Sequence, residues 1–264
     1  MNKRVALPMY DIHPPVTDAL WAALRPLLIS EGAAAEPIFV RPNDLPDHWR
    51  DDELLLSQTC GYPLTTQLPQ VQTVGCFHYS APGCEGLFYR SFLVARAEDK
   101  GKTLADFQGR TAVCNATDSH SGYNALRKMV AQLSPPLRFF GDVMFSGGHR
   151  QSLLALKQRQ ADIAAIDCVT FALLQRHQPS LVAGLRLVEE TLLAPGLPLI
   201  TSRQTSAGTL AALRAALQRL VSDRTLHDVC AAALIQGFSP VNRDEYDVML
   251  QWQREAAVAG VDAL

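Results

Sequence analysis

Short apolar runs alternate with longer amphipathic runs along most of the chain. The short runs predict β-strands at 4–9, 38–40, 53–56, 71–79, 87–96, 111–114, 139–145 and 163–166. Apolar residues at helical spacing predict helices at 16–29, 122–133, 150–159, through 173–174, and in the last third at 210–220, 226–234 and 246–257. This alternation predicts an α/β fold.

Two breaks in the pattern predict a chain that is divided into two lobes. The strand 87–96 and the Pro-Gly-Leu-Pro segment at 195–198 enclose a self-contained stretch of strands and helices. We therefore expect 1–91 and 195–264 to form lobe 1, and 92–194 to form lobe 2. Two chain crossings between lobes make a hinge, and hinged lobes can close on a ligand in the cleft between them.

Composition excludes several classes of protein. Of the 264 residues, 48% are hydrophobic and 19% are charged, which supports a buried core, and the net charge of −2 supplies no field for nucleic acid. No apolar run reaches the roughly 18 residues of a membrane span. The start of the chain lacks a secretory signal, which predicts a cytoplasmic protein unless the start is truncated or processed.

The cysteines indicate neither a metal nor a cofactor. The six cysteines form no Cys-x-x-Cys pair and no cluster with histidine at zinc spacing. Cys76 and Cys84 lie close enough in sequence to approach across a loop, but free thiols are the prediction.

A polar turn follows each of four short apolar strands, at 57–62, 115–124, 146–149 and 167–170. In open α/β sheets, ligands bind at the carboxyl ends of the strands, beside helix N-termini. Unpaired backbone N–H groups and the helix dipole favour anions there. The four turns therefore predict one site for a small anion.

The individual residues of these turns, and two residues of a nearby strand, also have a purely structural interpretation. Ser119 and Ser121 suit an anion site, but serine is also a common helix N-cap. His149 follows two glycines and either binds the anion or is structural. Asp167 either caps the next helix or accepts hydrogen bonds from a ligand. Tyr89 and Ser91 share a strand face, which sheet packing also explains.

Four motifs together resemble the PhnD-like phosphate, phosphite and phosphonate branch of substrate-binding proteins, which has the periplasmic binding protein type 2 fold. They are Tyr-x-Ser at 89–91, Leu-x-Asp-Phe-x-Gly at 104–109, Ser-x-Ser-Gly at 119–122 and Gly-x-His at 147–149. His120 stands where relatives often have threonine. The resemblance implies that Ser119, Ser121, His149 and Asp167 bind the anion and that Tyr89 lines the cleft. The full predicted binding set is Tyr10, Gln58, Tyr62, Tyr89, Ser91, Asn115, Ser119, His120, Ser121, Tyr123, Ser146, His149 and Asp167.

The leading functional prediction is a monomeric solute-binding protein without catalytic residues that delivers a phosphonate-like or phosphate-like anion to the membrane subunits of an ABC transporter. Membership of this family would imply a periplasmic location. The alternatives are a cytosolic lyase-type enzyme on the same fold, with His120, His149 and Asp167 as acid–base groups, and a ligand-sensing domain.

Overall fold

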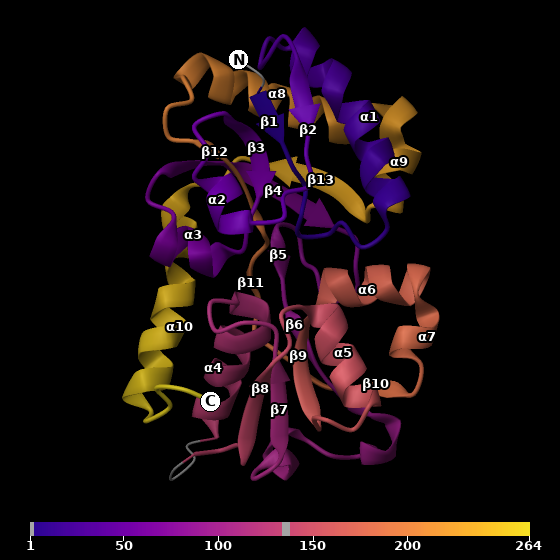
Figure 1. Cartoon of the computed structure of the whole chain (residues 1–264), viewed down its shortest axis with the longest axis vertical. Helices are drawn as coiled ribbons and strands as arrows, with labels where there is room; N and C mark the ends of the chain where they lie inside the picture. The colour runs from indigo at the N-terminus through magenta and orange to yellow at the C-terminus, as the bar shows by residue number, and fades with distance from the viewer. Residues whose placement is uncertain (1–2, 134–137) are drawn as a thin grey trace. The chain divides into compact units, whose positions relative to one another are not determined.

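The computed structural model describes residues 3–133 and 138–264 (Figure 1). The chain forms two compact units. Unit 1 comprises Met1–Ser80, Glu85–Phe88 and Pro195–Tyr246, and unit 2 comprises Ala81–Cys84, Tyr89–Ala194 and Asp247–Leu264. At two places the chain passes from one unit to the other within a short strand, in β5 (Phe88–Tyr89) and in β11 (Ala194–Pro195).

Unit 1 is built on a mixed six-stranded sheet. The strand order is β13-β4-β12-β3-β1-β2, in which β1 pairs in parallel with β2 and β3, and β12 and β13 run antiparallel to β4. The central strand β3 is buried along its whole length, and it begins with three consecutive leucines. The strands are β1 (Lys3–Val5), β2 (Pro37–Phe39), β3 (Leu54–Gln58), β4 (Val71–Tyr79), β12 (Pro198–Ser202) and β13 (Ile235–Ser239).

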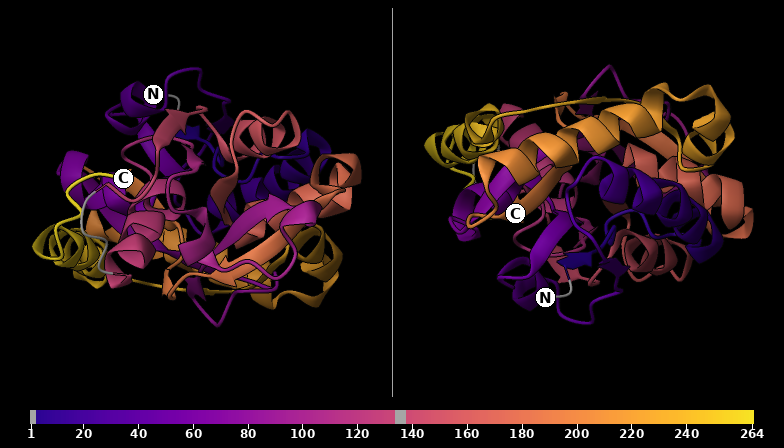
Figure 2. Two further views of the ribbon diagram at one scale, coloured as in Figure 1. Left: turned by 90° about the horizontal axis from the view of Figure 1, so that it is seen from below. Right: turned by 90° about the horizontal axis from the view of Figure 1, so that it is seen from above.

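Helix α1 (Pro14–Ser30) shows how the sequence sets the helices of unit 1. It starts with two prolines, which suit a first helical turn, and it buries Leu20, Leu24 and Leu28 at helical spacing. It contacts α8, which is also in contact with β4 and β13 (Figure 2). The unit's other helices are α2 (Leu45–Trp49), α3 (Gly61–Gln67), α8 (Ala207–Ser222), η4 (Arg224–Leu226), α9 (His227–Ala232) and η5 (Arg243–Tyr246).

Unit 2 is built on a mixed five-stranded sheet with the order β10-β6-β9-β7-β8. Strand β7 runs parallel to β8 and β9, whereas β6 runs antiparallel to β9 and β10. The strands are β6 (Ser91–Arg96), β7 (Thr111–Cys114), β8 (Asp142–Phe145), β9 (Ile163–Asp167) and β10 (Leu185–Glu190). The core includes Leu93, Phe107, Leu126 and Phe140, which are all almost completely buried.

Helices follow the strands of unit 2. They are η1 (Ala97–Asp99), η2 (Leu104–Phe107), the π-helical turn η3 (His120–Asn124), α4 (Ala125–Gln132), α5 (His149–Lys157), α6 (Cys168–His177), α7 (Pro179–Val182) and α10 (Asp247–Val258). Helix α5 contacts β7 and β9, and α10 lies alongside α4 (Figures 1 and 2).

The final segment, 247–264, belongs to unit 2, whereas the sequence analysis assigned it to lobe 1. Asn124 donates to the carbonyl of Met249 (3.0 Å), and Arg127 donates to the carbonyl of Asp262 (2.8 Å). These contacts join residues that are far apart in sequence, so no local pattern reveals them.

The structure confirms the predicted α/β class and differs in details. The predicted strand 87–96 is divided into β5 and β6, and the predicted first strand ends early, at Val5. Strands β10 and β13 and helices α2 and α3 are additional. Strand β13 lies at the edge of its sheet and contains Gly237. A glycine has no side chain to pack, and it interrupts the apolar pattern that would predict a strand.

No helix within 3–133 or 138–264 has the length and apolar character needed to span a membrane. All six cysteines are free thiols. Cys84 Sγ lies 3.5 Å from the sulfur of Cys168, and Cys76 Sγ instead donates to the carbonyl of Phe77.

Candidate functional site

The polar turns of unit 2 meet at one edge of its sheet. Strands β7, β8 and β9 are parallel, so their carboxyl ends lie on the same edge, and Asn115 and Ser146 follow the first two of them. Asp167 is the last residue of β9, and its antiparallel partner across the sheet is Ser91, the first residue of β6. The topology therefore collects four predicted site residues at this edge.

Ser119 caps the turn that leads into α4. Its hydroxyl accepts a hydrogen bond from the backbone N–H of Gly122 (3.0 Å), which is the N-cap interaction that the sequence left as an alternative. The turn is π-helical and its residues His120, Ser121, Gly122 and Asn124 are buried. π-helical turns are frequent at functional sites.

A side-chain hydrogen bond joins two of the predicted helix starts. Ser121 Oγ lies 2.9 Å from His149 Nε2, so the turn before α4 meets the first residue of α5. A Cβ on Gly122 would lie 1.9 Å from Asn115 Oδ1 and 3.3 Å from His149 Cε1. Only glycine permits this close approach, which brings Asn115, Ser121 and His149 into one cluster.

Two polar atoms of this cluster have no hydrogen-bond partner among the residues that the structure describes. They are Asn115 Oδ1 and His149 Nδ1, and both are inaccessible to water. A buried polar atom without a partner costs roughly 1–3 kcal/mol, and such atoms are rare in folded proteins. Burial also lowers the pKa of His149 to about 4, so its imidazole is neutral at pH 7.

Asp167 caps helix α6. Its Oδ1 accepts hydrogen bonds from the backbone N–H groups of Val169 (2.7 Å) and Thr170 (2.9 Å), and its side chain is buried. Neighbouring Ser91 is also buried and is bonded through its backbone N–H to Thr191 Oγ1 (2.9 Å). Capping accounts for one oxygen of Asp167, and the register places its side chain on the same sheet face as that of Ser91.

His120 and Tyr89 lie near each other in the interior. Their ring centroids are 6.5 Å apart, and the His120 ring packs at 5.0 Å from Trp252 of α10. Burial lowers the pKa of His120 to about 3. Trp252 was not among the predicted residues, and its distance in sequence from the turn leaves no local signal for it.

The contacts of Tyr123 and Ser146 are structural. Tyr123 packs 6.0 Å from the Phe145 ring and accepts a hydrogen bond from the backbone N–H of Leu264 (3.3 Å). Ser146 Oγ bonds the carbonyl of Gly148 (3.0 Å) and the hydroxyl of Ser152 (2.7 Å). Their predicted binding role stays a prediction.

The three predicted residues of unit 1 lie at the carboxyl edge of its own sheet. Gln58 Nε2 donates to the hydroxyl of Tyr79 (3.1 Å), and the ring of Tyr10 packs edge-on against Tyr79 at 5.0 Å. Tyr62 lies in α3 and its carbonyl accepts hydrogen bonds from Thr65 and Thr66 (both 2.8 Å).

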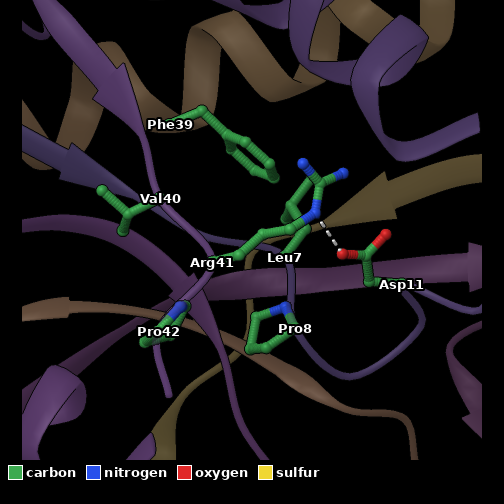
Figure 3. Close-up of a pocket in the computed structure, with 7 residues that line it drawn as sticks. All are labelled: Leu7, Pro8, Asp11, Phe39, Val40, Arg41 and Pro42. Carbon is green, nitrogen blue, oxygen red and sulfur yellow. Dashed lines mark hydrogen bonds and ion pairs between the residues drawn. The ribbon is translucent and has the colours of Figure 1, made fainter. Parts of the chain in front are cut away.

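A cavity of about 240 Å³ opens at the same edge of unit 1, beyond the ends of β1 and β2 (Figure 3). Arg41 points across it and donates to Asp11 (2.7 Å) and Asp18 (2.7 Å), and its guanidinium carbon lies 5.1 Å from the centre of the Phe39 ring. These hydrogen bonds to Asp11 and Asp18 raise the pKa of Arg41. The lining residues are Leu7, Pro8, Asp11, Phe39, Val40, Arg41 and Pro42.

Solved structures with the same fold are similar over nearly the whole chain. The binding-protein component of an ABC phosphonate transporter (PA3383) from Pseudomonas aeruginosa superposes with a TM-score of 0.79 at 17% identity, covering 98% of this chain and 87% of that one. PhnD1 from Prochlorococcus marinus in complex with methylphosphonate gives 0.76 at 13% identity, covering 96% and 97%. XAC2383 from Xanthomonas citri bound to ATP gives 0.72 at 13% identity, covering 97% of each chain.

Among curated protein sequences, none matches the chain. The family model described as "ABC transporter, phosphonate, periplasmic substrate-binding protein" matches residues 75–246, which is more than half of the chain. This match confirms the resemblance that the four motifs indicated, and the structural neighbours confirm the two-lobed type 2 binding-protein fold. The chain therefore belongs to the family of periplasmic substrate-binding proteins of phosphonate ABC transporters, and its role is to bind a solute.

Proposed function

We propose that the cluster at the sheet edge of unit 2 binds the oxyanion group of a small phosphonate or phosphate. The observation that carries this proposal is the hydrogen bond between Ser121 Oγ and His149 Nε2 (2.9 Å), which joins the starts of α4 and α5. Two helix starts that meet at one point direct two positive dipole ends toward the same place. Such a place favours an anion without a buried cation.

His149 and Ser119 supply side-chain donors, and Ser121 orients His149. Neutral imidazole has one nitrogen that donates and one that accepts. When Ser121 donates to Nε2, His149 Nδ1 carries the ring hydrogen and donates it to the ligand. The N-cap residue of α5 is Gly148, which provides no side-chain cap, so the backbone N–H groups of the first turn add further donors.

Asn115 and Asp167 favour a ligand that carries a hydrogen as well as a negative charge. Asn115 Oδ1 is a buried acceptor with no partner in the described part of the chain, and Asp167 is an acidic group at the same sheet edge. A singly protonated phosphonate or phosphate has both an acidic hydroxyl and acceptor oxygens. The methylphosphonate bound to PhnD1 of Prochlorococcus marinus supports this ligand class.

We infer from the family that the chain works as a monomer in the periplasm and passes its ligand to the membrane subunits of an ABC transporter. We infer further that binding is not followed by a reaction. A histidine whose pKa lies near 4 is a weak base at neutral pH, which disfavours the enzymatic alternative. Phosphorus NMR of methylphosphonate incubated with the protein would then show an unchanged ligand.

The decisive experiment measures ligand binding by the wild type and by Ser121→Ala. We expect methylphosphonate, phosphate or phosphite to raise the melting temperature by about 5–10 °C at roughly 100 times its Kd, by mass action. Removing the Ser121 hydroxyl deletes the hydrogen bond that holds His149 with its Nδ1–H directed at the charged ligand. We expect calorimetry to show at least about a tenfold weaker Kd.

The matched control is Ser206→Ala, because Ser206 also stands at a helix start, where it caps α8 in unit 1. This variant should lose some stability and keep the wild-type Kd. Equal loss of affinity in both variants, or no thermal shift with any of the three anions at millimolar concentration, contradicts the proposal.

A further inference from the structure

Two of the six cysteines face each other in unit 2. Cys84 Sγ and Cys168 Sγ lie 3.5 Å apart, although 84 residues separate them in sequence. A disulfide bond is about 2.05 Å long, so the two sulfurs need to approach by roughly 1.5 Å.

Backbone packing sets this separation. The segment Ala81–Cys84 forms a tight turn, in which the N–H of Cys84 donates to the carbonyl of Ala81 (3.0 Å). Gly83 has a positive φ of 93°, and a Cβ there would lie 3.0 Å from Cys168 Cβ and from the Phe92 ring. The turn therefore rests directly on Cys168, and both the positive φ and the tight contact that a Cβ would make favour glycine there.

The two thiols differ in access to solvent. Cys84 is partly exposed, whereas Cys168 is completely buried at the first position of α6. The hydrogen bond with Cys84 and burial both raise the pKa of Cys168. An oxidant from solution thus meets Cys84 first, and the buried thiol is placed to react only with the sulfur beside it.

We propose that Cys84 and Cys168 form a reversible intramolecular disulfide that fastens the turn Ala81–Cys84 to the start of α6. The co-reactant is a small disulfide such as oxidised glutathione. The thiolate of Cys84 attacks one of its sulfurs, which releases one glutathione thiolate and leaves a mixed disulfide on Cys84. Cys168 then loses its proton and attacks Cys84 Sγ, which releases the second glutathione. Two electrons pass from the protein to oxidised glutathione, and two thiol protons end on the two reduced glutathiones.

The bond would act beside the proposed anion site. Cys168 directly follows Asp167, and its backbone N–H donates to the carbonyl of Arg90 (3.1 Å), between Tyr89 and Ser91. The disulfide chemistry itself does not depend on ligand binding, so it can succeed or fail independently of the proposed function.

The test exposes the folded, full-length chain to oxidised glutathione and then maps its thiols by alkylation and mass spectrometry. We expect loss of two hydrogens, protection of two cysteines, and one peptide that joins Cys84 to Cys168. Dithiothreitol should restore all free thiols. The oxidised protein should melt higher by roughly 5–10 °C, because the bond closes a long loop.

Single substitutions give an asymmetric result that only this order of reaction predicts. In Cys168→Ser, Cys84 should keep one glutathione as a stable mixed disulfide. In Cys84→Ser, the buried Cys168 should stay reduced. The control Cys230→Ser, which removes another buried thiol, should form the bond as the wild type does. A Cys76–Cys84 bond, a stable glutathione adduct on the wild type, or no loss of thiols overturns the proposal.

Discussion

The carboxyl edges of the two sheets carry polar residues in both units, but their charges are compensated differently. In unit 1, Arg41 faces a cavity of about 240 Å³ and is already bonded to two carboxylates, those of Asp11 and Asp18. In unit 2, the cluster contains no cation, and Asn115 Oδ1 and His149 Nδ1 are buried without partners in the described residues. The Arg41 guanidinium therefore has less unused hydrogen-bonding capacity than the neutral polar groups of the unit 2 cluster.

Among the substitutions that test this comparison of the two units, we expect Gly122→Ala to have the largest effect on ligand affinity. The new Cβ would lie 1.9 Å from Asn115 Oδ1, so the Asn115 side chain must rotate out of the cluster. We expect methylphosphonate affinity, measured by calorimetry, to fall about tenfold or more. The stability change should stay below about 1 kcal/mol, because the displaced atom ends a flexible side chain.

Gly208→Ala is the matched control, since a Cβ there meets only Ser206 Oγ at 3.8 Å. It should leave affinity unchanged. If Gly122→Ala acts through Asn115, the double variant with Asn115→Ala should bind no more weakly than either single variant. If Gly122→Ala binds methylphosphonate as tightly as the wild type does, the glycine has no part in the site and the proposed role of the unit 2 cluster is contradicted.

A second effect concerns pH. Burial lowers the pKa of His149 to about 4 and that of His120 to about 3, from 6.5 in the unfolded chain. Between these values the unfolded chain binds more protons, so the stabilisation is complete above pH 6.5 and is lost as the pH falls toward 4 and 3. The share of His149 amounts to a few kcal/mol at most, at about 1.4 kcal/mol per pKa unit.

Urea unfolding between pH 7 and pH 4.5 measures this dependence. His149→Gln should be less sensitive to pH than the wild type over that range, with the contribution of His120 remaining. Identical pH dependence in the two proteins would mean that His149 is not buried as a neutral ring.

The smallest effect is expected from Arg41→Gln in unit 1. The Arg41 side chain is 43% exposed, and ion pairs at such positions contribute about 0–1 kcal/mol to stability. We expect a small loss in the urea midpoint and an unchanged Kd for methylphosphonate. Tenfold weaker binding of methylphosphonate by this variant would instead indicate that the anion binds near Arg41 in unit 1.

The sequence by itself determined the α/β class and several strand and helix positions. The strands Val71–Tyr79 and Thr111–Cys114 match their predictions, because runs rich in β-branched and aromatic residues between polar turns favour strands. The motifs at 119–122 and 147–149 also indicated the family, since a helix-start motif is a local property of the sequence.

Only the tertiary structure determined which of the predicted binding residues contact one another. Ser121 and His149 are joined, whereas Ser146 is engaged with its own turn and Tyr123 packs toward the end of the chain. Likewise, α10 supplies Trp252 beside His120, and Cys84 meets Cys168 instead of Cys76. Contacts between distant segments depend on how elements pack, and packing is a property of the assembled core that no local run of residues encodes.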